Sequence, residues 1–459
     1  MKTRLVVLSF LLAGCATSLP EVEQEKLPSL PAEFKQNFTV AAPAAAEPRG
    51  EWWKAFSDPA LDALIARADG SNASIQVAAA RLAQARALAR VTDAARAPQI
   101  GVGASAQRLQ GIVNGGPPGP ARSVFATGVD LSYEVDLFGR LSHASEAATL
   151  DAQAREALLQ STRLLVQAEV AQAYLALRAV DAERELVGTT LRTYRETHEL
   201  TERRWRAGDI AELDVARAAT EVAATESEAL ALERRRAQLE HALAILVGEA
   251  PASFSIEPFE WKTALPAIPA GVPATVLTRR PDVSAAQHNV LAAQARVGVA
   301  QAAWFPNIAL TASGGYASTE LSDLFKWSSR AWGIGLLASL PIFDGGRRKA
   351  GLQAASADFD AAIAQYREQV LVAFKDVEDQ LAAIRLLGEQ GEAQSRAVAS
   401  AQRATSLSDA RYRAGYVSQL ELLDARRSEL RNRREALQVR SARYQSTVAL
   451  VRALGGAWE

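Results

Sequence analysis

The sequence predicts a mainly α-helical fold in which long helical hairpins are combined with four β-strands. Three observations lead to this fold class. Alanine, the strongest helix former, dominates a chain of 459 residues that is 49% hydrophobic but only 6% aromatic. Proline is absent from residues 121–250 and again from 342–459, which permits very long helices. Four short segments show the alternation of apolar and small or polar side chains that is typical of strands.

The composition argues against several functional classes. The chain has 51 Lys and Arg against 52 Asp and Glu, a net charge of -1, whereas a nucleic-acid binder normally has a basic excess. One cysteine excludes an internal disulfide and a cysteine-rich metal site, and the four histidines show no metal-binding spacing. We find no glycine-rich phosphate loop and no GxSxG motif. We therefore expect no enzyme activity, no metal, no cofactor and no nucleic-acid partner.

The N-terminus has the pattern of an export signal. Lys2 and Arg4 precede an apolar stretch, residues 5–12, that is too short for a stable transmembrane helix. The next residues, Leu12-Ala-Gly-Cys15, resemble a bacterial lipobox. This resemblance to bacterial lipoproteins implies that Ala16, in place of an aspartate, favours sorting to the outer membrane. We expect a signal peptide at 1–14, lipidation of Cys15 and an extended tether over 15–50, which is rich in Pro, Ala and Glu.

The chain contains an internal duplication. The sequence Arg204-Trp-Arg-Ala-Gly208 returns as Arg411-Tyr-Arg-Ala-Gly415, which is a shift of 207 residues. A period this long indicates two copies of one domain plan rather than a solenoid. We expect the copies at 51–250 and 274–455, separated by a proline-rich linker at 251–273.

Each copy is predicted to contain one long helical hairpin, at 140–248 and at 346–454. The first helix of each would be about 95–100 Å long at 1.5 Å per residue. Gly208 and Gly415 would end these helices in the left-handed conformation and form the two tips. Shorter helices are expected at 58–69, 72–96 and 274–303.

The four strands are expected at about 98–110, 123–137, 306–317 and 330–343. One face of each is apolar, and the lengths suit tilted strands that cross a membrane. An ordinary soluble sheet is the alternative, although little of the chain is left to supply its core. Four strands cannot close a membrane barrel, so two copies would give eight strands and three would give twelve. Asp130, Glu134 and Asp136 would then form an acidic wall of the lumen.

The motifs together resemble those of TolC-type outer-membrane efflux proteins, in their lipidated NodT or OprM-like branch. The resemblance covers essentially the whole chain. It rests on the lipobox at Cys15 and on six further motifs: Trp52-Trp-Lys-Ala-Phe-Ser-Asp-Pro-Ala-Leu61, Asp136-Leu-Phe-Gly-Arg140, Phe343-Asp-Gly-Gly-Arg347, Arg279-Arg-Pro-Asp-Val283, Trp304-Phe-Pro306 and Arg411-Tyr-Arg-Ala-Gly415.

This resemblance implies a homotrimer with a twelve-stranded barrel in the outer-membrane lipid and a twelve-helix periplasmic tunnel. The tips at Gly208 and Gly415 would contact a periplasmic adaptor (membrane fusion) protein, which joins an inner-membrane pump of the RND type. The protein itself would be a passive, gated exit duct for drugs or other small toxic solutes. The family pattern also places a periplasmic gate at Leu420, Asp424 and Arg427, which share one helix face. The first copy has Arg217 at the position aligned with Asp424, and a pair between these two residues is one option.

Other functions remain open at this level. Within the family, the protein could serve type I protein secretion or the efflux of metal ions. A structural coiled-coil lipoprotein is the alternative from another class, and the four amphipathic strands argue against it. For the gate residues, the simpler interpretation is a core leucine beside an exposed ion pair worth less than about 1 kcal/mol.

Overall fold

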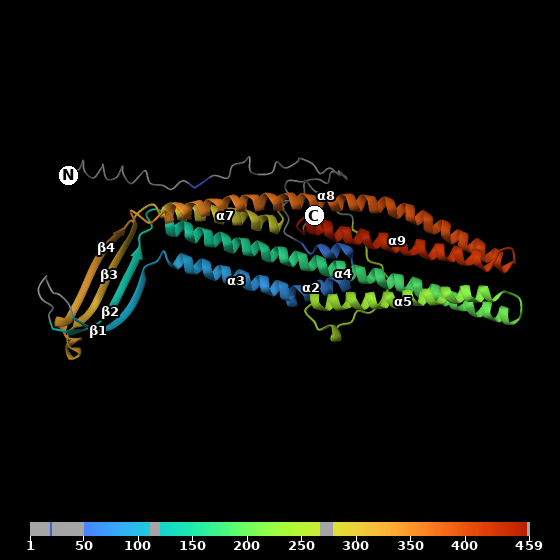
Figure 1. The fold of residues 1–459 in the computed structure, drawn as a ribbon, viewed down its shortest axis with the longest axis horizontal. Coiled ribbons are helices and arrows are strands. Elements are labelled where there is room, and N and C mark those ends of the chain that lie inside the picture. The colour runs from blue at the N-terminus through green and yellow to red at the C-terminus, as the bar shows by residue number, and fades with distance from the viewer. Residues whose placement is uncertain (1–18, 21–49, 111–119, 267–278, 457–459) are drawn as a thin grey trace. The chain divides into compact units, whose positions relative to one another are not determined.

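The computed structural model describes residues 19–20, 50–110, 120–266 and 279–456. Cys15 and the signal peptide lie outside these residues, as do most of the tether, residues 111–119 between the first two strands and part of the linker. The described chain is mainly helical, with one small sheet (Figure 1), which confirms the predicted fold class. Within the described residues, none of the helices combines the length and the apolar composition that a membrane span requires.

The helices repeat with the predicted period. The longest, α4 and α8, have 67 residues each and start 207 positions apart, and their partners α5 and α9 have 35 residues each. The α-helices are α2 (Pro59–Ser71), α3 (Ala73–Ala94), α4 (Arg140–Arg206), α5 (Glu212–Leu246), α7 (Pro281–Ala302), α8 (Arg347–Arg413) and α9 (Gln419–Ala453). Short 3-10 helices are η2 (Trp52–Phe56), η3 (Pro251–Ser253), η4 (Leu321–Asp323) and η5 (Trp327–Ser329).

The helix expected at 274–303 is not continuous. Arg280 is non-helical and α7 starts at Pro281, while residues 274–278 lie outside the described part. Proline has no backbone N–H and disfavours the helical conformation of the residue before it, so it fits the first turn of a helix but not its interior. The expectation was therefore wrong at Arg280, which is free to make the side-chain contacts described below.

The four strands form one antiparallel sheet in the order β1-β2-β3-β4. Their bounds are β1 (Gln99–Leu109), β2 (Arg122–Glu134), β3 (Asn307–Ser318) and β4 (Arg330–Ser339). The register aligns the predicted apolar residues into rows that cross all four strands: Ile100, Leu131, Ala312 and Ile334 form one row, and Val102, Val129, Gly314 and Trp332 form the next. This apolar face is exposed, since Val102 and Ile334 are 82% and 81% exposed.

Two strands are shorter than expected. β2 ends at Glu134 rather than at residue 137, and the Asp136 side chain accepts hydrogen bonds at the start of α4 instead. β4 ends at Ser339 rather than at residue 343, because Pro341 cannot donate a hydrogen bond to a ladder.

The chain forms two compact units, and each of them takes segments from both copies. The first unit comprises residues 1–28, 80–157 and 284–368, and the second 29–79, 158–283 and 369–459. The compact units therefore do not follow the boundaries of the duplication, because the long helices α4 and α8 pass from one unit into the other.

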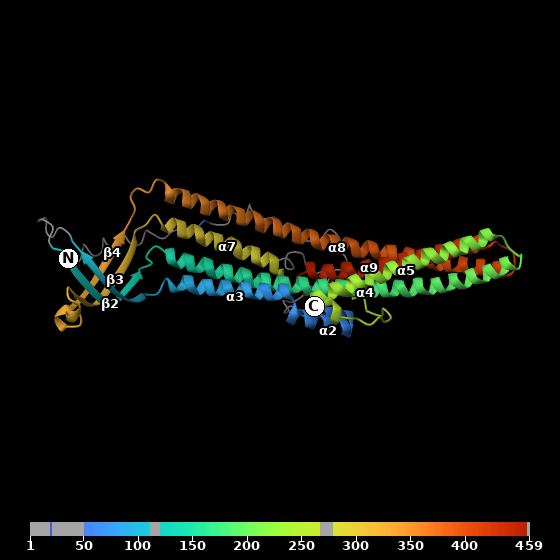
Figure 2. The same ribbon diagram turned by 60° about the horizontal axis from the view of Figure 1, so that its bottom comes forward.

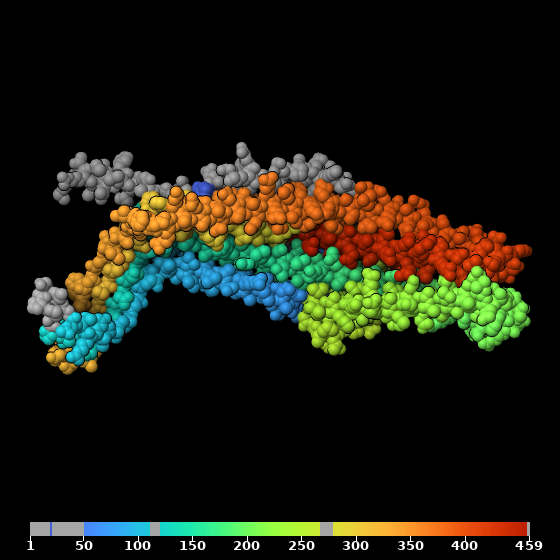
Figure 3. Space-filling view, viewed as in Figure 1, coloured from blue at the N-terminus to red at the C-terminus, as the bar shows by residue number. Residues whose placement is uncertain are grey.

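Within the first unit, α3, α4, α7 and the beginning of α8 lie side by side, with the sheet at one end (Figure 2). The space-filling view shows these helices as adjoining bands (Figure 3). The α7–α8 contact is made by Val290, Ala293, Val297, Phe359 and Ile363. In the second unit, Val377 and Leu381 of α8 pack against the end of α9, and Val180 and Val187 of α4 pack against Leu232 of α5. The three- and four-residue spacing of these residues is what binds the helices in pairs.

Candidate functional site

The two hairpin tips have the same backbone geometry. Gly208 and Gly415 have φ angles of 84° and 77°, in the left-handed region that glycine adopts without a steric penalty. In the first tip, the N–H of Gly208 bonds to Trp205 O and that of Asp209 bonds to Arg204 O, both at 2.9 Å. The second tip repeats the pattern at Gly415 and Tyr416. Both long helices therefore end in a Schellman motif, as the glycines predicted.

The two tips are joined to each other. Arg204 Nη1 lies 3.4 Å from the Tyr412 hydroxyl, so the two copies of the repeated motif meet. Gln419, the first residue of α9, donates to Thr201 Oγ1 of α4 at 3.0 Å, and both side chains are buried. Two aromatic rings remain at the surface, since Trp205 is 40% and Tyr416 79% exposed. The tips thus form one surface that carries exposed aromatic and cationic side chains.

The predicted gate residues lie on one face of α9, directly after the second tip. Leu420 is 38% exposed, whereas its neighbours Leu422 and Leu423 are 2% and 1% exposed. Asp424 follows one turn later, and Arg427 Nη1 lies 3.2 Å from its carboxylate. The buried leucines hold α9 in place, and the face with Leu420 and Asp424 stays open. Leu420 is therefore not a core leucine of the single chain.

Arg427 also has a partner that the sequence did not reveal. Its second Nη atom forms an ion pair with Glu221 of α5, whose side chain is largely buried. The pair that the sequence left open, between Asp424 and Arg217, is not among the ion pairs of the described residues, and Arg217 lies 3.6 Å from Asp214 instead. This face of α9 is consequently tied to the first hairpin through Arg427. No local sequence pattern could have identified Glu221, because it lies 206 residues away in the chain.

Further ion pairs and hydrogen bonds join the two hairpins. Arg434 of α9 contacts Glu183 of α4 at 2.7 Å and Glu228 of α5 at 3.0 Å. Arg426 donates to Thr197 of α4 at 2.8 Å and pairs with Asp409 of α8 at 3.1 Å. Glu226 of α5 pairs with the half-exposed Arg195, whereas Glu228 contributes to the junction between the hairpins.

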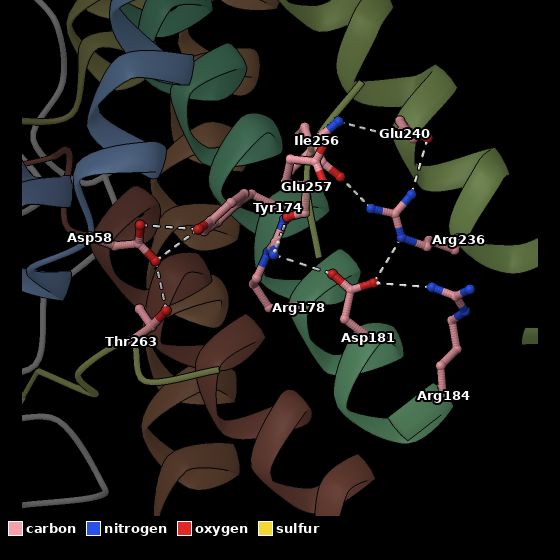
Figure 4. Close-up of polar contacts among 10 residues, drawn as sticks. All are labelled: Asp58, Tyr174, Arg178, Asp181, Arg184, Arg236, Glu240, Ile256, Glu257 and Thr263. Atoms are coloured by element: carbon pink, nitrogen blue, oxygen red, sulfur yellow. Dashed lines mark hydrogen bonds and ion pairs between the residues drawn. The ribbon is translucent and has the colours of Figure 1, made fainter. Parts of the chain in front are cut away.

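A second polar cluster fastens the middle of the first hairpin (Figure 4). Arg178 of α4 is completely buried, donates to the Glu257 carbonyl at 3.0 Å and lies 3.3 Å from Asp181. Asp181 also pairs with Arg236 of α5 at 2.8 Å. Glu240 of α5 accepts the N–H of Ile256 at 2.7 Å. The described part of the linker is therefore held against both helices of the hairpin, as the polar contacts in the figure show.

Asp58 extends this cluster to the start of the first copy. Its carboxylate caps α2 by accepting the N–H groups of Ala60 and Leu61. It also accepts the Tyr174 hydroxyl at 2.9 Å and that of Thr263 at 2.8 Å. Burial, followed by the nearby Asp58 charge, raises the pKa of Tyr174 well above its usual value. The second copy has Gly388 at the position that matches Asp181, so the two hairpins are anchored by different residues.

The three acidic residues expected on the polar face of the sheet have separate roles in the chain. Asp130 belongs to β2, and its carboxylate lies over Gly101 of β1, on the face opposite the apolar rows. Glu134 ends β2 and forms an ion pair with Arg140 at 2.7 Å.

Asp136 lies after the strand and caps α4, because it accepts from the N–H of Leu141 and from the N–H and hydroxyl of Ser142. Although burial raises the pKa of Asp136, these hydrogen bonds outweigh it and lower the pKa overall. The expectation that Asp136 continues the strand was therefore wrong. Among the described residues, no three His, Cys, Asp or Glu side chains gather into a group that could hold a metal ion.

Comparison with known proteins shows which family has this sequence and architecture. The sequence model of the outer membrane efflux protein family matches residues 64–249 and 272–456, which is one match for each copy. The cation efflux system protein CusC of Escherichia coli O6:H1 is 32% identical over 455 residues, or 98% of this chain and 97% of its own. The solvent efflux pump outer membrane protein SrpC of Pseudomonas putida is 36% identical over 406 residues, or 88% of this chain and 86% of its own.

A solved structure agrees with these sequence matches. The outer membrane protein VceC of Vibrio cholerae superimposes with a TM-score of 0.84 at 31% identity, over 90% of this chain and all of that one. The family match covers most of the chain, and the helices and strands lie in the predicted order. The protein belongs to the outer membrane efflux protein family and is an outer-membrane efflux channel.

Proposed function

We propose that the protein is the outer-membrane duct of a tripartite pump that expels drugs, solvents or other small toxic solutes. In this assembly three copies form one tube, a periplasmic adaptor contacts the tips around Gly208 and Gly415, and an inner-membrane RND-type pump supplies the energy. The relatives are named as efflux proteins and pump components, which supports a transport duct rather than an enzyme or a structural coiled-coil lipoprotein.

The open edges of the sheet support the trimer. Within the described chain, β1 and β4 each pair on one side only, and an unpaired strand edge is not tolerated in lipid. The apolar rows on one face would contact the membrane, and the opposite face with Asp130 and Glu134 would line the lumen. Three chains with four strands each give twelve strands, an even number within the range that outer-membrane barrels have.

The exposed face of α9 is the observation that best supports a gated duct. Leu420 and Asp424 are exposed in the single chain although they lie beside two fully buried leucines. In a trimer this face would occur three times around the axis, and three carboxylates could close together only if cations or Arg427 offset their repulsion. Such a constriction would favour cations and would open on small displacements of α9.

Bilayer conductance tests the gate. We expect Leu420→Ala and Asp424→Ala, separately and combined, to increase the single-channel current, and Asp424→Ala to weaken cation selectivity. Leu407→Ala is the matched control, because Leu407 is an exposed leucine of α8 in the same hairpin. Unchanged current in a well-folded double variant would exclude these residues from the gate.

Efflux of metal ions is the second candidate, because CusC is named as a cation efflux protein and the proposed gate is acidic. The sequence favours organic solutes over soft metal ions. Soft metal ions such as Cu(I) prefer thiolate or thioether ligands, but the chain has one cysteine, Cys15, and one methionine, Met1. The tunnel wall would therefore offer no sulfur ligand. Protein export by a type I system is a further alternative, and no observation on this chain favours it.

Lipidation of Cys15 is part of the same proposal. Three acyl chains would anchor the N-terminus stably, at roughly 0.8 kcal/mol per buried CH₂. Radiolabelled palmitate should be incorporated into the wild-type protein and lost in Cys15→Ser. Continued incorporation in the variant would contradict the lipid anchor but would leave the duct untouched.

A further inference from the structure

A groove of about 540 Å³ lies in the first unit, on one face of the helical layer. Its walls come from α3, α4 and α7, which run side by side in both ribbon views (Figures 1 and 2). The side chains that define its chemistry are Arg81 and Leu88 of α3, Asp151 and Arg155 of α4, and Asn289 and Arg296 of α7. None of these residues belongs to the gate, the tips or the cluster in Figure 4.

The groove has an excess of positive charge. Three guanidinium groups face a single carboxylate, and Asp151 is already paired with Arg296. Arg81 and Arg155 have no ion-pair partner among the described residues. Both are exposed, as is Leu88, which adds an apolar surface at 57% exposure. The groove therefore combines two uncompensated cations with an apolar side chain.

The position of Pro20 indicates which side of the layer the groove is on. Gln294 of α7 donates a hydrogen bond to the Pro20 carbonyl at 2.7 Å. Arg296 follows two residues later, about 200° around the helix, and so points to the opposite side. If the N-terminus is anchored in lipid, the face of α7 that contacts Pro20 is the outer side of the proposed duct. The groove would then open to the inside.

We propose that this groove binds organic anions, namely carboxylates and sulfonates with an apolar body, as they pass through the tunnel. The inference rests on the proposed duct function. Arginine recognises such groups through paired, charge-assisted hydrogen bonds, and Leu88 contacts the apolar body. In the proposed duct, this basic wall would attract the anionic group, while the exposed leucine binds the apolar body.

Block of the channel by a small anion tests this proposal. Single-channel currents of the trimer in planar bilayers are recorded with increasing naphthalene-2-sulfonate. In the double variant Arg81→Gln with Arg155→Gln, the concentration for half-maximal block should rise roughly tenfold, because two charge-assisted contacts are lost. Arg86→Gln is the matched control, since Arg86 is also on α3 but pairs with Glu156 at 3.1 Å outside the groove. It should change the block by less than about twofold.

The neutral probe naphthalene-2-methanol separates charge recognition from apolar binding, and it should block weakly and equally in all variants. Equal block by the sulfonate in the wild type and the double variant would overturn the proposal. Calorimetric titration of the detergent-solubilised protein with the sulfonate gives a second readout that needs no current. A protein that conducts nothing contradicts the duct, whereas binding that the double variant loses still supports the groove.

Discussion

Asn72 and Arg280 make the same contact in the two copies, although their side chains differ. Asn72 Nδ2 donates to the carbonyl of Leu246, the last residue of α5, at 2.8 Å. Arg280 Nη1 donates to the carbonyl of Ala453, the last residue of α9, at 3.0 Å. Each contact satisfies a carbonyl that a helix end leaves without an intrahelical partner. In both copies this contact fixes the hairpin to the point where a shorter helix begins.

The two contacts should differ in their contribution to stability. Asn72→Ala removes a helix cap and one hydrogen bond, and we expect a loss of about 1–2 kcal/mol. Arg280→Ala should cost about 3 kcal/mol or more, because it leaves the carboxylates of Asp282 and Asp376 unpaired in a largely buried place. Thermal unfolding in mild detergent, followed by circular dichroism, measures both. Equal losses for the two variants would contradict this ranking.

Acidification should weaken the same junction. Burial raises the pKa of Asp282, but the hydrogen bond and charge of Arg280 outweigh it and lower the pKa below the ordinary value of 3.8. A carboxyl with a lowered folded-state pKa contributes stability above its unfolded pKa and loses it as the pH falls through the folded value. The unfolding temperature should therefore drop below about pH 4. Asp282→Asn should be less stable at pH 7 and should lose less on acidification than the wild type.

The exposed aromatic residues at the tips should matter for partner binding rather than for folding. Tyr416 and Trp205 project from the tips, so their replacement by alanine should leave the unfolding temperature within about 2 °C. Cross-linking to the adaptor and efflux should fall severalfold if the tips form the contact. Gly415→Pro should disrupt the tip itself, since proline cannot adopt the φ of 77° found there. Normal efflux in all three variants would show that the tips are only turns.

The two faces of the sheet should respond differently to a charge. Ile334→Lys places a cation on the exposed apolar face of β4, where lipid contact makes it cost about 2–4 kcal/mol near the bilayer centre. Ser313→Lys is the matched control, because Ser313 lies in the neighbouring strand, on the face that carries Asp130. Heat-modifiable migration and membrane fractionation should show poor insertion for Ile334→Lys only. Equal insertion of both would argue against a lipid-facing apolar side.

Local patterns in the sequence were sufficient for most elements of the fold. Alternation placed all four strands, and the absence of proline placed the long helices, because periodicity and helix termination depend on nearby residues. Gly208 and Gly415 could be recognised as left-handed caps for the same reason. Where local signals compete, the prediction failed: Pro281 delayed the start of α7, and Asp136 capped α4 instead of extending β2.

The sequence by itself determined the duplication, the helical hairpins, the apolar strand faces and the position of the proposed gate residues on one helix face. Only the tertiary structure decided which distant side chains meet. Glu221 became the partner of Arg427, Arg178 was buried beneath Glu257, and Arg280 took the role of Asn72. The physical reason is that ion pairs and hydrogen bonds depend on distances of a few ångströms across packed elements, and residues 79 to 206 positions apart in the chain carry no local trace of such a contact.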